Sequence, residues 1–169
     1  MDDVQIREIT GSELVPLTFR LRFEVWREEA ELTNEVQAQG QITDAHDGHA
    51  RHWAAFDGEE IVAAARMCIH TLQEESPDAP MFRGTQLPAP IATINRLVVT
   101  KRWRRLGVAR QLDLCRIQAA RENGAACVVL SAFDWRINSL QALGFKLTEF
   151  RWGPPFAYRL TSCGMILSV

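Results

Sequence analysis

Residues 91–124 constrain the fold most strongly, because they place a strand, a basic turn and a helix in one short stretch. Residues 94–99, INRLVV, are rich in β-branched and aliphatic side chains and are long enough for a buried strand. The basic turn KRWRRLG follows at 101–107. Beyond it, apolar residues recur at roughly helical spacing as far as Gly124, which has the position of a helix C-cap.

The start of this helix is predicted to bind an anion. The first backbone amides of a helix have no intrahelical acceptor, and the helix dipole adds partial positive charge at the same point. Gly107 lets the backbone approach a bulky diphosphate, and the small Ala109 leaves the first helical turn unobstructed. The alternative is a strand and helix whose connecting turn is basic for another reason, such as contact with nucleic acid.

Arg104, Gly107 and Ala109 follow a strand in the spacing Arg-x-x-Gly-x-Ala, which resembles the [Arg/Gln]-x-x-Gly-x-[Gly/Ala] acetyl-CoA signature of the GNAT superfamily of N-acetyltransferases. The expected element order, β-α-β-β-β-α-β-α-β-β, resembles this family over nearly the whole chain. The resemblance implies an α/β fold in which a mixed central sheet, with diverging parallel central strands, is flanked by helices. It also implies a single N-acetyltransferase domain over residues 1–169.

The other elements are expected from local patterns of apolar residues and turn formers. The predicted strands are 4–9, 53–56, 61–69, 94–99, 126–132, 146–151 and 156–168. The predicted helices are 13–30, a short piece near 34–39, the segment after Gly107, and 134–143. We expect strand 126–132 to run parallel to 94–99 through a right-handed crossover. Residues 31–50 and 71–90 are expected to be long loops.

Composition limits the classes of function. A chain of 169 residues with 47% hydrophobic residues fits one domain with a substantial core. The net charge of −2 argues against a general nucleic-acid binder, because the basic character is confined to residues 101–110. The four cysteines lack CxxC spacing and are expected to be reduced thiols. Without an apolar signal region or a run of ~20 apolar residues, we expect a cytoplasmic protein with no membrane partner.

The resemblance implies acetyl-CoA as acyl-donor cosubstrate, bound in the notch between the diverging strands. Its pantetheine is expected to pair with the backbone of 97–99, and its pyrophosphate to rest on the amides of 105–110. Asn138 matches an asparagine that is frequent in the family and often contacts the cofactor. The implied cofactor-binding residues are Leu97, Val98, Val99, Arg104, Arg105, Leu106, Gly107, Val108, Ala109, Arg110 and Asn138.

The implied chemistry is direct attack of an amine on the thioester carbonyl, which needs a base, an oxyanion donor and an acid for the thiolate. The backbone amide near Val99 is the expected oxyanion donor. Many relatives place a tyrosine four residues before the glycine of a Gly-Phe pair, but here that position is Leu140. The remaining candidate for the acid is Tyr158, which is expected on the last strand. The alternative is that Tyr158 is an ordinary half-buried strand residue.

Polar side chains at the end of loop 31–50 are candidates for the acceptor side: Asp44, Asp47, His49 and His52. The alternative is that the aspartates satisfy loop amides and the last histidine fills a strand position. Because neighbouring strand residues alternate, only one of Asn95 and Arg96 is expected to face the cleft. The predicted catalytic set is Asp47, His52, Asn95 and Tyr158. No metal site is expected, because Gly48 disfavours the helix that would align the histidines.

The front half also resembles the acyl-homoserine lactone synthases. The residues that carry this second resemblance are Arg22, Val25, Trp26, Asp44, Asp47 and Arg66. The synthases have a glutamate three residues before an arginine of the central strand, and here Thr93 stands in that place before Arg96. The chain therefore departs from the synthases at a candidate base.

We therefore predict an acyl-CoA-dependent N-acyltransferase that transfers acetyl from acetyl-CoA to a primary amine of a small molecule or peptide. The alternatives are a non-catalytic CoA-binding regulator on the same fold, a synthase-like acyltransferase, and a nucleic-acid-binding protein, although no nucleic acid is expected as a partner. Acceptor specificity is expected to depend on loops 31–50 and 71–90. The resemblance also allows a homodimer.

Overall fold

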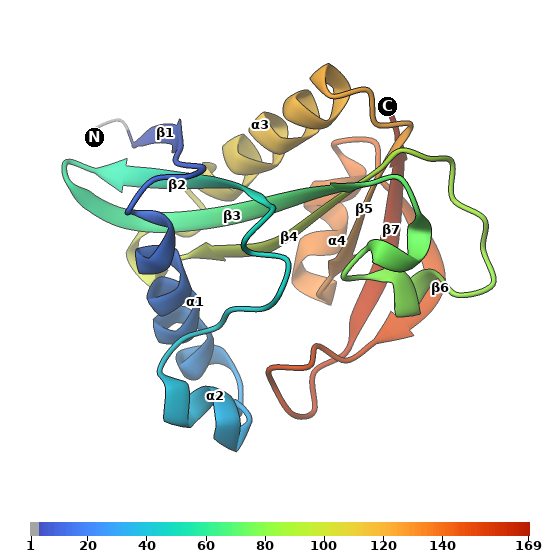
Figure 1. Ribbon diagram of the computed structural model, residues 1–169. Coiled ribbons are helices and arrows are strands. Elements are labelled where there is room, and N and C mark those ends of the chain that lie inside the picture. The colour runs from blue at the N-terminus through green and yellow to red at the C-terminus, as the bar shows by residue number, and fades with distance from the viewer. Residues whose placement is uncertain (1–3) are drawn as a thin grey trace.

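A seven-stranded sheet in the order β1-β2-β3-β4-β5-β7-β6 runs through the computed structural model, which describes residues 4–169 (Figure 1). The strands are β1 (Gln5–Glu8), β2 (Arg51–Asp57), β3 (Glu60–His70), β4 (Ile91–Val99), β5 (Cys127–Ala132), β6 (Lys146–Trp152) and β7 (Ser162–Ser168). The α-helices are α1 (Val15–Glu29), α2 (Asn34–Gln39), α3 (Val108–Glu122) and α4 (Asp134–Gln141). Short 3-10 helices are η1 (Gln73–Glu75), η2 (Ala79–Phe82) and η3 (Lys101–Trp103). The predicted mixed α/β fold is confirmed, with β4 and β5 as the parallel pair.

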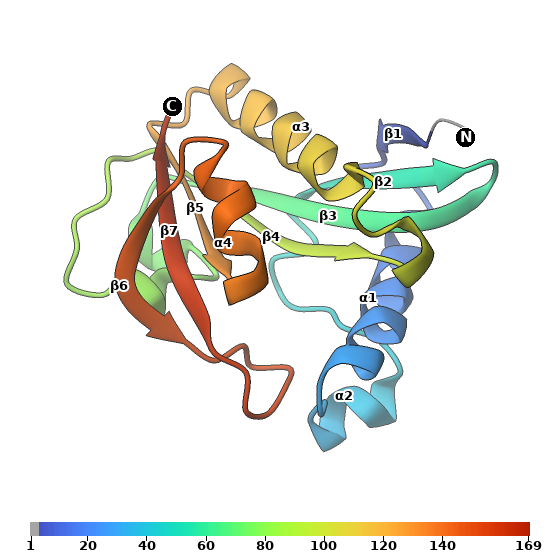
Figure 2. The same ribbon diagram turned by 180° about the vertical axis from the view of Figure 1, so that it is seen from behind.

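β4 and β5 part after a short parallel ladder. Residues 91–93 pair with 127–129, and no residue beyond them on β4 pairs with β5 in the described chain. Along its other edge, β5 pairs antiparallel with β7 over the whole of 127–132. Figures 1 and 2 show the two strands separating toward their C-terminal ends. The predicted parallel direction is confirmed, but the ladder lies before residues 94–99, because β4 begins earlier than its β-branched run indicated.

A β-bulge interrupts β4 at Arg96, whose φ is 52°. The register between β3 and β4 shifts at this point, just after Asn95 pairs with Arg66. Arg116 of α3 satisfies the carbonyl groups beside the bulge, because its Nη1 donates to the oxygens of Arg66 and Asn95 at 3.2 Å each. The prediction of strict alternation at 95–96 is therefore wrong, because a bulge re-aims the side chains that follow it.

Helices cover both faces of the sheet (Figure 2). α3 and α4 pack on one face, where Leu112 and Leu140 belong to the main hydrophobic cluster. α1 packs on the other face, where Val25 meets Ala64 of β3 and Val98 of β4. The small side chain of Ala64 lets the helix approach the sheet closely. Within residues 4–169, no helix has both the length and the apolar composition needed to cross a membrane.

Residues 153–161 form a loop rather than the start of the last strand. β7 begins at Ser162, so the predicted strand 156–168 is too long. Within this loop, Arg159 has a left-handed backbone conformation with a φ of 55°, which is incompatible with a continuous strand. The loop is tied to the segment after α1, because the Tyr158 amide donates to the Glu31 carbonyl at 2.8 Å.

Candidate functional site

The turn between β4 and α3 leaves backbone amides unpaired at the start of α3. Arg105 and Gly107 both have left-handed backbone, with φ of 62° and 83°. Gly107 directly precedes α3, and no side chain among the described residues caps this helix. The amides of Val108 to Arg110 therefore have no intrahelical acceptor. A Cβ on Gly107 would meet no described atom within 4 Å, so this glycine serves the backbone conformation rather than packing.

Arg104 holds this turn in place. Its Nε donates to the Val99 carbonyl at 3.0 Å, and its Nη1 pairs with Glu29 of α1 at 2.5 Å. The indole of Trp103 is buried beneath the turn. The other cationic side chains of this region are exposed: Lys101, Arg102, Arg105 and Arg110. The turn therefore presents positive charge to solvent while one arginine fixes its shape.

Most of the predicted cofactor-binding residues lie in one continuous region. Residues 97–99 end β4, 104–107 belong to the turn, and 108–110 begin α3. Asn138 lies apart from them in sequence, with an exposed side chain on α4. α3 follows β4 and α4 follows β5, so both helices start at the carboxyl ends of the two diverging strands. Ligands of open α/β sheets bind at such a point.

A buried ion network lies on the α1 side of β3 and β4. Arg66 of β3 is fully buried, and its Nη1 lies 2.6 Å from Asp44 Oδ1 and 3.0 Å from Asp47 Oδ1. Its Nε donates to Asn95 Oδ1 at 2.9 Å. Arg96, turned by the bulge, donates to Asp44 Oδ2 at 2.5 Å. The bulge thus allows both neighbours on β4 to join one network.

Asp47 is saturated by hydrogen bonds. Arg22 of α1 donates to its Oδ1 at 2.9 Å, while the Thr43 hydroxyl and the Asp44 amide donate to its Oδ2 at 2.9 Å each. Burial raises the pKa of Asp47, but the charges of Arg22 and Arg66 outweigh it and hold the pKa below its ordinary value. The same balance, with Arg66 and Arg96, holds the pKa of Asp44 far below its ordinary range. This geometry favours the interpretation in which both aspartates are structural.

The other predicted catalytic side chains do not meet at one point. His52 is only 1% exposed, and its Nε2 lies 3.0 Å from the Asp47 carbonyl oxygen. Burial lowers the pKa of this histidine, although that hydrogen bond opposes the shift. Tyr158 is 46% exposed on loop 153–161, not on the last strand. Leu140, at the position of the family's tyrosine, is 1% exposed in the core, so the side chain there is turned away from solvent.

An aromatic cluster that no local sequence pattern predicts connects the two halves of the molecule beyond the point where β4 and β5 part. The ring of Trp26 in α1 lies 5.2 Å, between centroids, from each of the rings of Phe133 and Phe156. Phe133 follows β5, and Phe156 lies in loop 153–161. Arg96 lies over the ring of Phe156, with Cζ 5.1 Å from its centroid. Trp135 stacks on Phe133 at 4.9 Å. These residues come from four distant segments, so no local pattern could have revealed the cluster.

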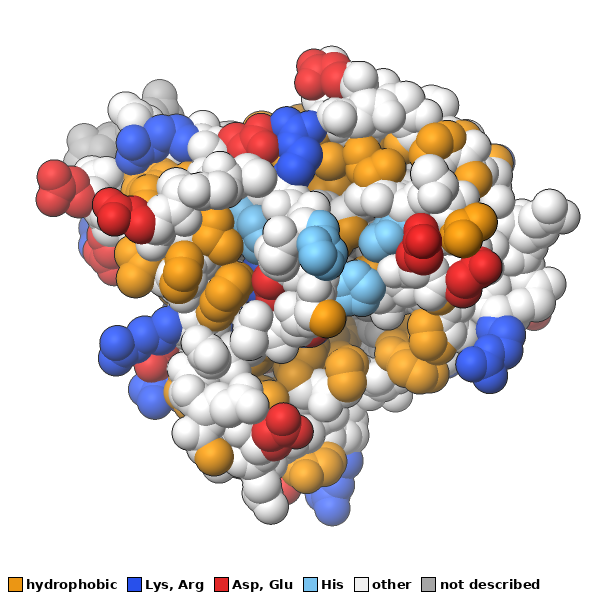
Figure 3. Space-filling model, in the orientation of Figure 1, with side chains coloured by type: hydrophobic (Ala, Val, Ile, Leu, Met, Phe, Trp, Pro, Cys, Tyr) orange, Lys and Arg blue, Asp and Glu red, His pale blue; other side chains and the backbone are white. Residues whose placement is uncertain are grey.

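Asp78, in the loop between η1 and η2, is also absent from the predicted site. Its side chain is buried, and its Oδ2 has no hydrogen-bond partner among residues 4–169. Histidine side chains gather on the face of the molecule shown in Figure 3, and the rings of His46 and His70 lie 5.9 Å apart. The described residues contain no group of three or more histidine, cysteine or acidic side chains placed to hold a metal ion.

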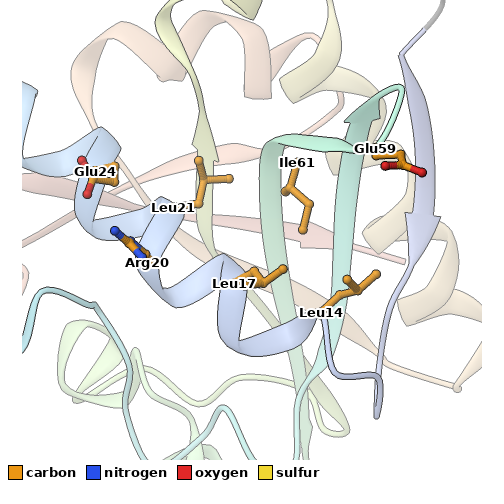
Figure 4. A pocket seen from close by; sticks show the side chains of 7 residues that line it. All are labelled: Leu14, Leu17, Arg20, Leu21, Glu24, Glu59 and Ile61. Carbon is orange, nitrogen blue, oxygen red and sulfur yellow. The ribbon is translucent and has the colours of Figure 1, made fainter.

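A hollow between α1 and the β2–β3 hairpin is separate from this region (Figure 4). It is lined by Leu14, Leu17, Arg20, Leu21, Glu24, Glu59 and Ile61. None of these residues belongs to the predicted site. The hollow lies along α1, and most of its lining side chains are apolar.

Comparison with known proteins identifies the architecture. A family model described as "Acetyltransferase (GNAT) family" matches residues 13–145. No curated protein matches the chain significantly.

Three solved structures with the same fold have a named activity or a bound ligand. FeeM, an N-acyl amino acid synthase from uncultured soil microbes, has a TM-score of 0.70 at 14% identity, covering 99% of this chain and 91% of its own. The CoA-dependent acyl-homoserine lactone synthase BjaI, solved with SAM and isopentyl-CoA, has a TM-score of 0.69 at 19% identity, covering 98% and 82%. A GNAT family acetyltransferase from Elizabethkingia anophelis with acetyl-CoA bound has a TM-score of 0.62 at 12% identity, and both chains are fully covered. At these identities the likeness is one of fold.

Proposed function

Because this chain belongs to the acetyltransferase (GNAT) family and is an acyltransferase, we propose that it transfers an acetyl group from acetyl-CoA directly to a primary amine. The acceptor that we propose is a small-molecule or peptide amine. The observation that carries the proposal is the turn at 101–107, whose left-handed residues lead into the uncapped start of α3. Its exposed cations and free amides fit a diphosphate.

The edge of β4 supports the proposed position of the pantetheine. β4 pairs with β3 along one edge, but beyond Thr93 its other edge has no strand partner in the part of the chain that the structure describes. Backbone amides and carbonyls on that edge, at 97–99, are suited to hydrogen-bond an amide-containing ligand as a missing strand would. An amide of the same segment, near Val99, is our proposed oxyanion donor. Acetyl-CoA, when bound, supplies the activated acyl group.

Two measurements test this proposal. Isothermal titration should show acetyl-CoA and CoA binding to the folded protein, with a dissociation constant on the order of 1–100 μM. Thiol detection with a panel of amino acids, polyamines, amino sugars and lysine peptides should then show CoA release with at least one amine. Absence of binding by wild-type protein overturns the proposal, and binding without turnover across the panel would indicate a CoA-binding regulator.

A second candidate is a synthase-like acyltransferase with a longer acyl donor. The observation that favours it is the network of Arg22, Asp44, Asp47, Arg66 and Arg96, which uses the residues shared with the synthases. The solved structure of BjaI contains SAM and isopentyl-CoA. CoA release that requires isopentyl-CoA, or that requires SAM as acceptor, would favour this candidate over acetyl transfer.

We also propose a cytoplasmic location. The four cysteines are free thiols in the structure, and burial raises the pKa of Cys68 to about 11, so this thiol stays protonated and unreactive. Free buried thiols fit a reducing compartment.

A further inference from the structure

We propose that Asp78 is the general base that takes the proton from the acceptor ammonium group. This inference rests on the proposed function and adds a residue to it. Asp78 belongs to the loop 71–90, for which no catalytic role follows from the family signature at 104–109.

Asp78 is anchored at the point where β4 and β5 part. Its amide donates to the Ser76 hydroxyl at 3.2 Å, and that hydroxyl lies 2.7 Å from the hydroxyl of Thr93. Thr93 is the last β4 residue that pairs with β5, and Asn95 follows two residues later on the same face of the strand. These contacts hold the backbone of Asp78 against the face of β4 that carries Thr93 and Asn95. The charges of Arg96, Arg66 and Asp44 act on its carboxyl group, so it lies within reach of the ion network on that face.

The carboxyl group of Asp78 is buried but incompletely bonded. The residue is 9% exposed, and Oδ2 has no partner within the described chain. Buried carboxylate oxygens in folded proteins are nearly always hydrogen-bonded, so an orphan of this kind needs an explanation. Arg96 faces the same region, and its buried Nε also lacks a partner. A polar ligand between β4 and this loop would satisfy such groups.

The raised pKa of the Asp78 carboxyl group suits a general base. Burial raises its pKa to about 6, and the nearby charge of Asp44 acts in the same direction, while Arg96 and Arg66 oppose it. Asp44 and Asp47 differ, because their arginine partners keep them ionised and occupied. Three carboxylates thus share this side of the sheet, and only one of them has both a free oxygen and an affinity for protons near neutral pH.

The proton and electron balance of the step is simple. The Asp78 carboxylate takes one proton from the ammonium, which leaves a lone pair on nitrogen. That nitrogen forms the C–N bond with the acyl carbon, the C–S bond breaks, and sulfur leaves with the electron pair. The second proton lost by the nitrogen neutralises the thiolate, so no acid is needed at Leu140. Asp78 returns its proton to solvent after the product leaves.

The test compares Asp78→Asn with Glu74→Gln, an exposed control in the same loop that also removes one negative charge. With an amine that releases CoA from the wild-type protein, Asp78→Asn should lower kcat/KM by a factor on the order of 100 or more. Its affinity for acetyl-CoA in calorimetry should be unchanged. The acidic limb of the wild-type pH profile, near pH 6, should disappear in Asp78→Asn, persist in Glu74→Gln, and return in Asp78→Glu.

A second measurement needs no acceptor. The side-chain carboxyl carbon of Asp78, assigned by its loss in Asp78→Asn, should titrate in ¹³C NMR with a pKa near 6. A titration at the ordinary aspartate value, or an Asp78→Asn enzyme with wild-type kcat/KM and an unchanged acidic limb, overturns the role of Asp78 while acetyl transfer stands. If wild-type protein neither binds acetyl-CoA nor releases CoA, both proposals fall together.

Discussion

Arg66 and Asp44 form a bidentate ion pair on the α1 side of the sheet, in which Arg66 Nη1 lies 2.6 Å from Oδ1 and Nη2 lies 3.1 Å from Oδ2. Arg66 comes from the middle of β3, and Asp44 comes from the loop before β2. The pair holds loop 31–50 against β3, beside the proposed acyl-transfer site. A guanidinium in this geometry satisfies both carboxylate oxygens at once.

Arg66→Met should destabilise the protein strongly, because it leaves the buried Asp47 and the partly buried Asp44 without a shared partner. We expect a loss of about 3–5 kcal/mol in the free energy of unfolding, measured by urea denaturation. Arg51→Met is the matched control, because Arg51 pairs with Glu8 at the surface and should cost only about 0–1 kcal/mol. Equal losses in the two variants would show that the buried network is not a main source of stability.

Acidification should weaken the network. The folded-state pKa values of Asp44 and Asp47 are depressed, so their contribution to stability is fully present above the unfolded-state value of about 4 and is lost as pH falls toward the folded-state values. Asp47→Asn should therefore show a flatter dependence of unfolding free energy on pH below about 4 than wild type. Parallel curves for the two proteins would contradict the assignment.

Asp78 should have the opposite pH dependence. Its folded-state pKa is raised to about 6, so protonation favours the folded state, and its contribution to stability is lost as pH rises from about 4 through 6. Asp78→Asn should thus be more stable than wild type at neutral pH, by roughly 2–3 kcal/mol in chemical denaturation. Glu74→Gln should leave the curve unchanged. A less stable Asp78→Asn protein would indicate that the ionised carboxylate has a structural partner.

Gly107→Ala should weaken acetyl-CoA binding by at least about tenfold in calorimetry. The added methyl group meets no described atom within 4 Å, so the loss would come from strain at a φ of 83° and from obstruction of the ligand. Gly58→Ala, in the hairpin turn with a φ of 60°, carries similar strain of about 1 kcal/mol far from the site and should bind acetyl-CoA normally. Unchanged affinity in a folded Gly107→Ala protein would mean that the turn does not hold the diphosphate.

The local elements could be predicted from the sequence. α2 has the predicted bounds of 34–39, and α1 lies within the predicted 13–30. Gly124, with a φ of 71°, follows the C-cap residue Asn123 of α3. The basic turn and the uncapped start of α3 follow from residues that are adjacent in the chain. Periodicity, caps and turns depend on hydrogen bonds between residues a few positions apart, which a single sequence displays directly.

The acceptor side of the site was decided by the tertiary structure. The bulge at Arg96 changed which β4 side chains share a face, and arginines from α1, β3 and β4 occupied the aspartates that the sequence offered as catalytic candidates. Asp78 differs from those aspartates only in its surroundings, because no arginine reaches its free oxygen in the described chain. The sequence by itself determined the turn that presents amides to a diphosphate, whereas burial and charge from distant segments decided which carboxylate can accept a proton.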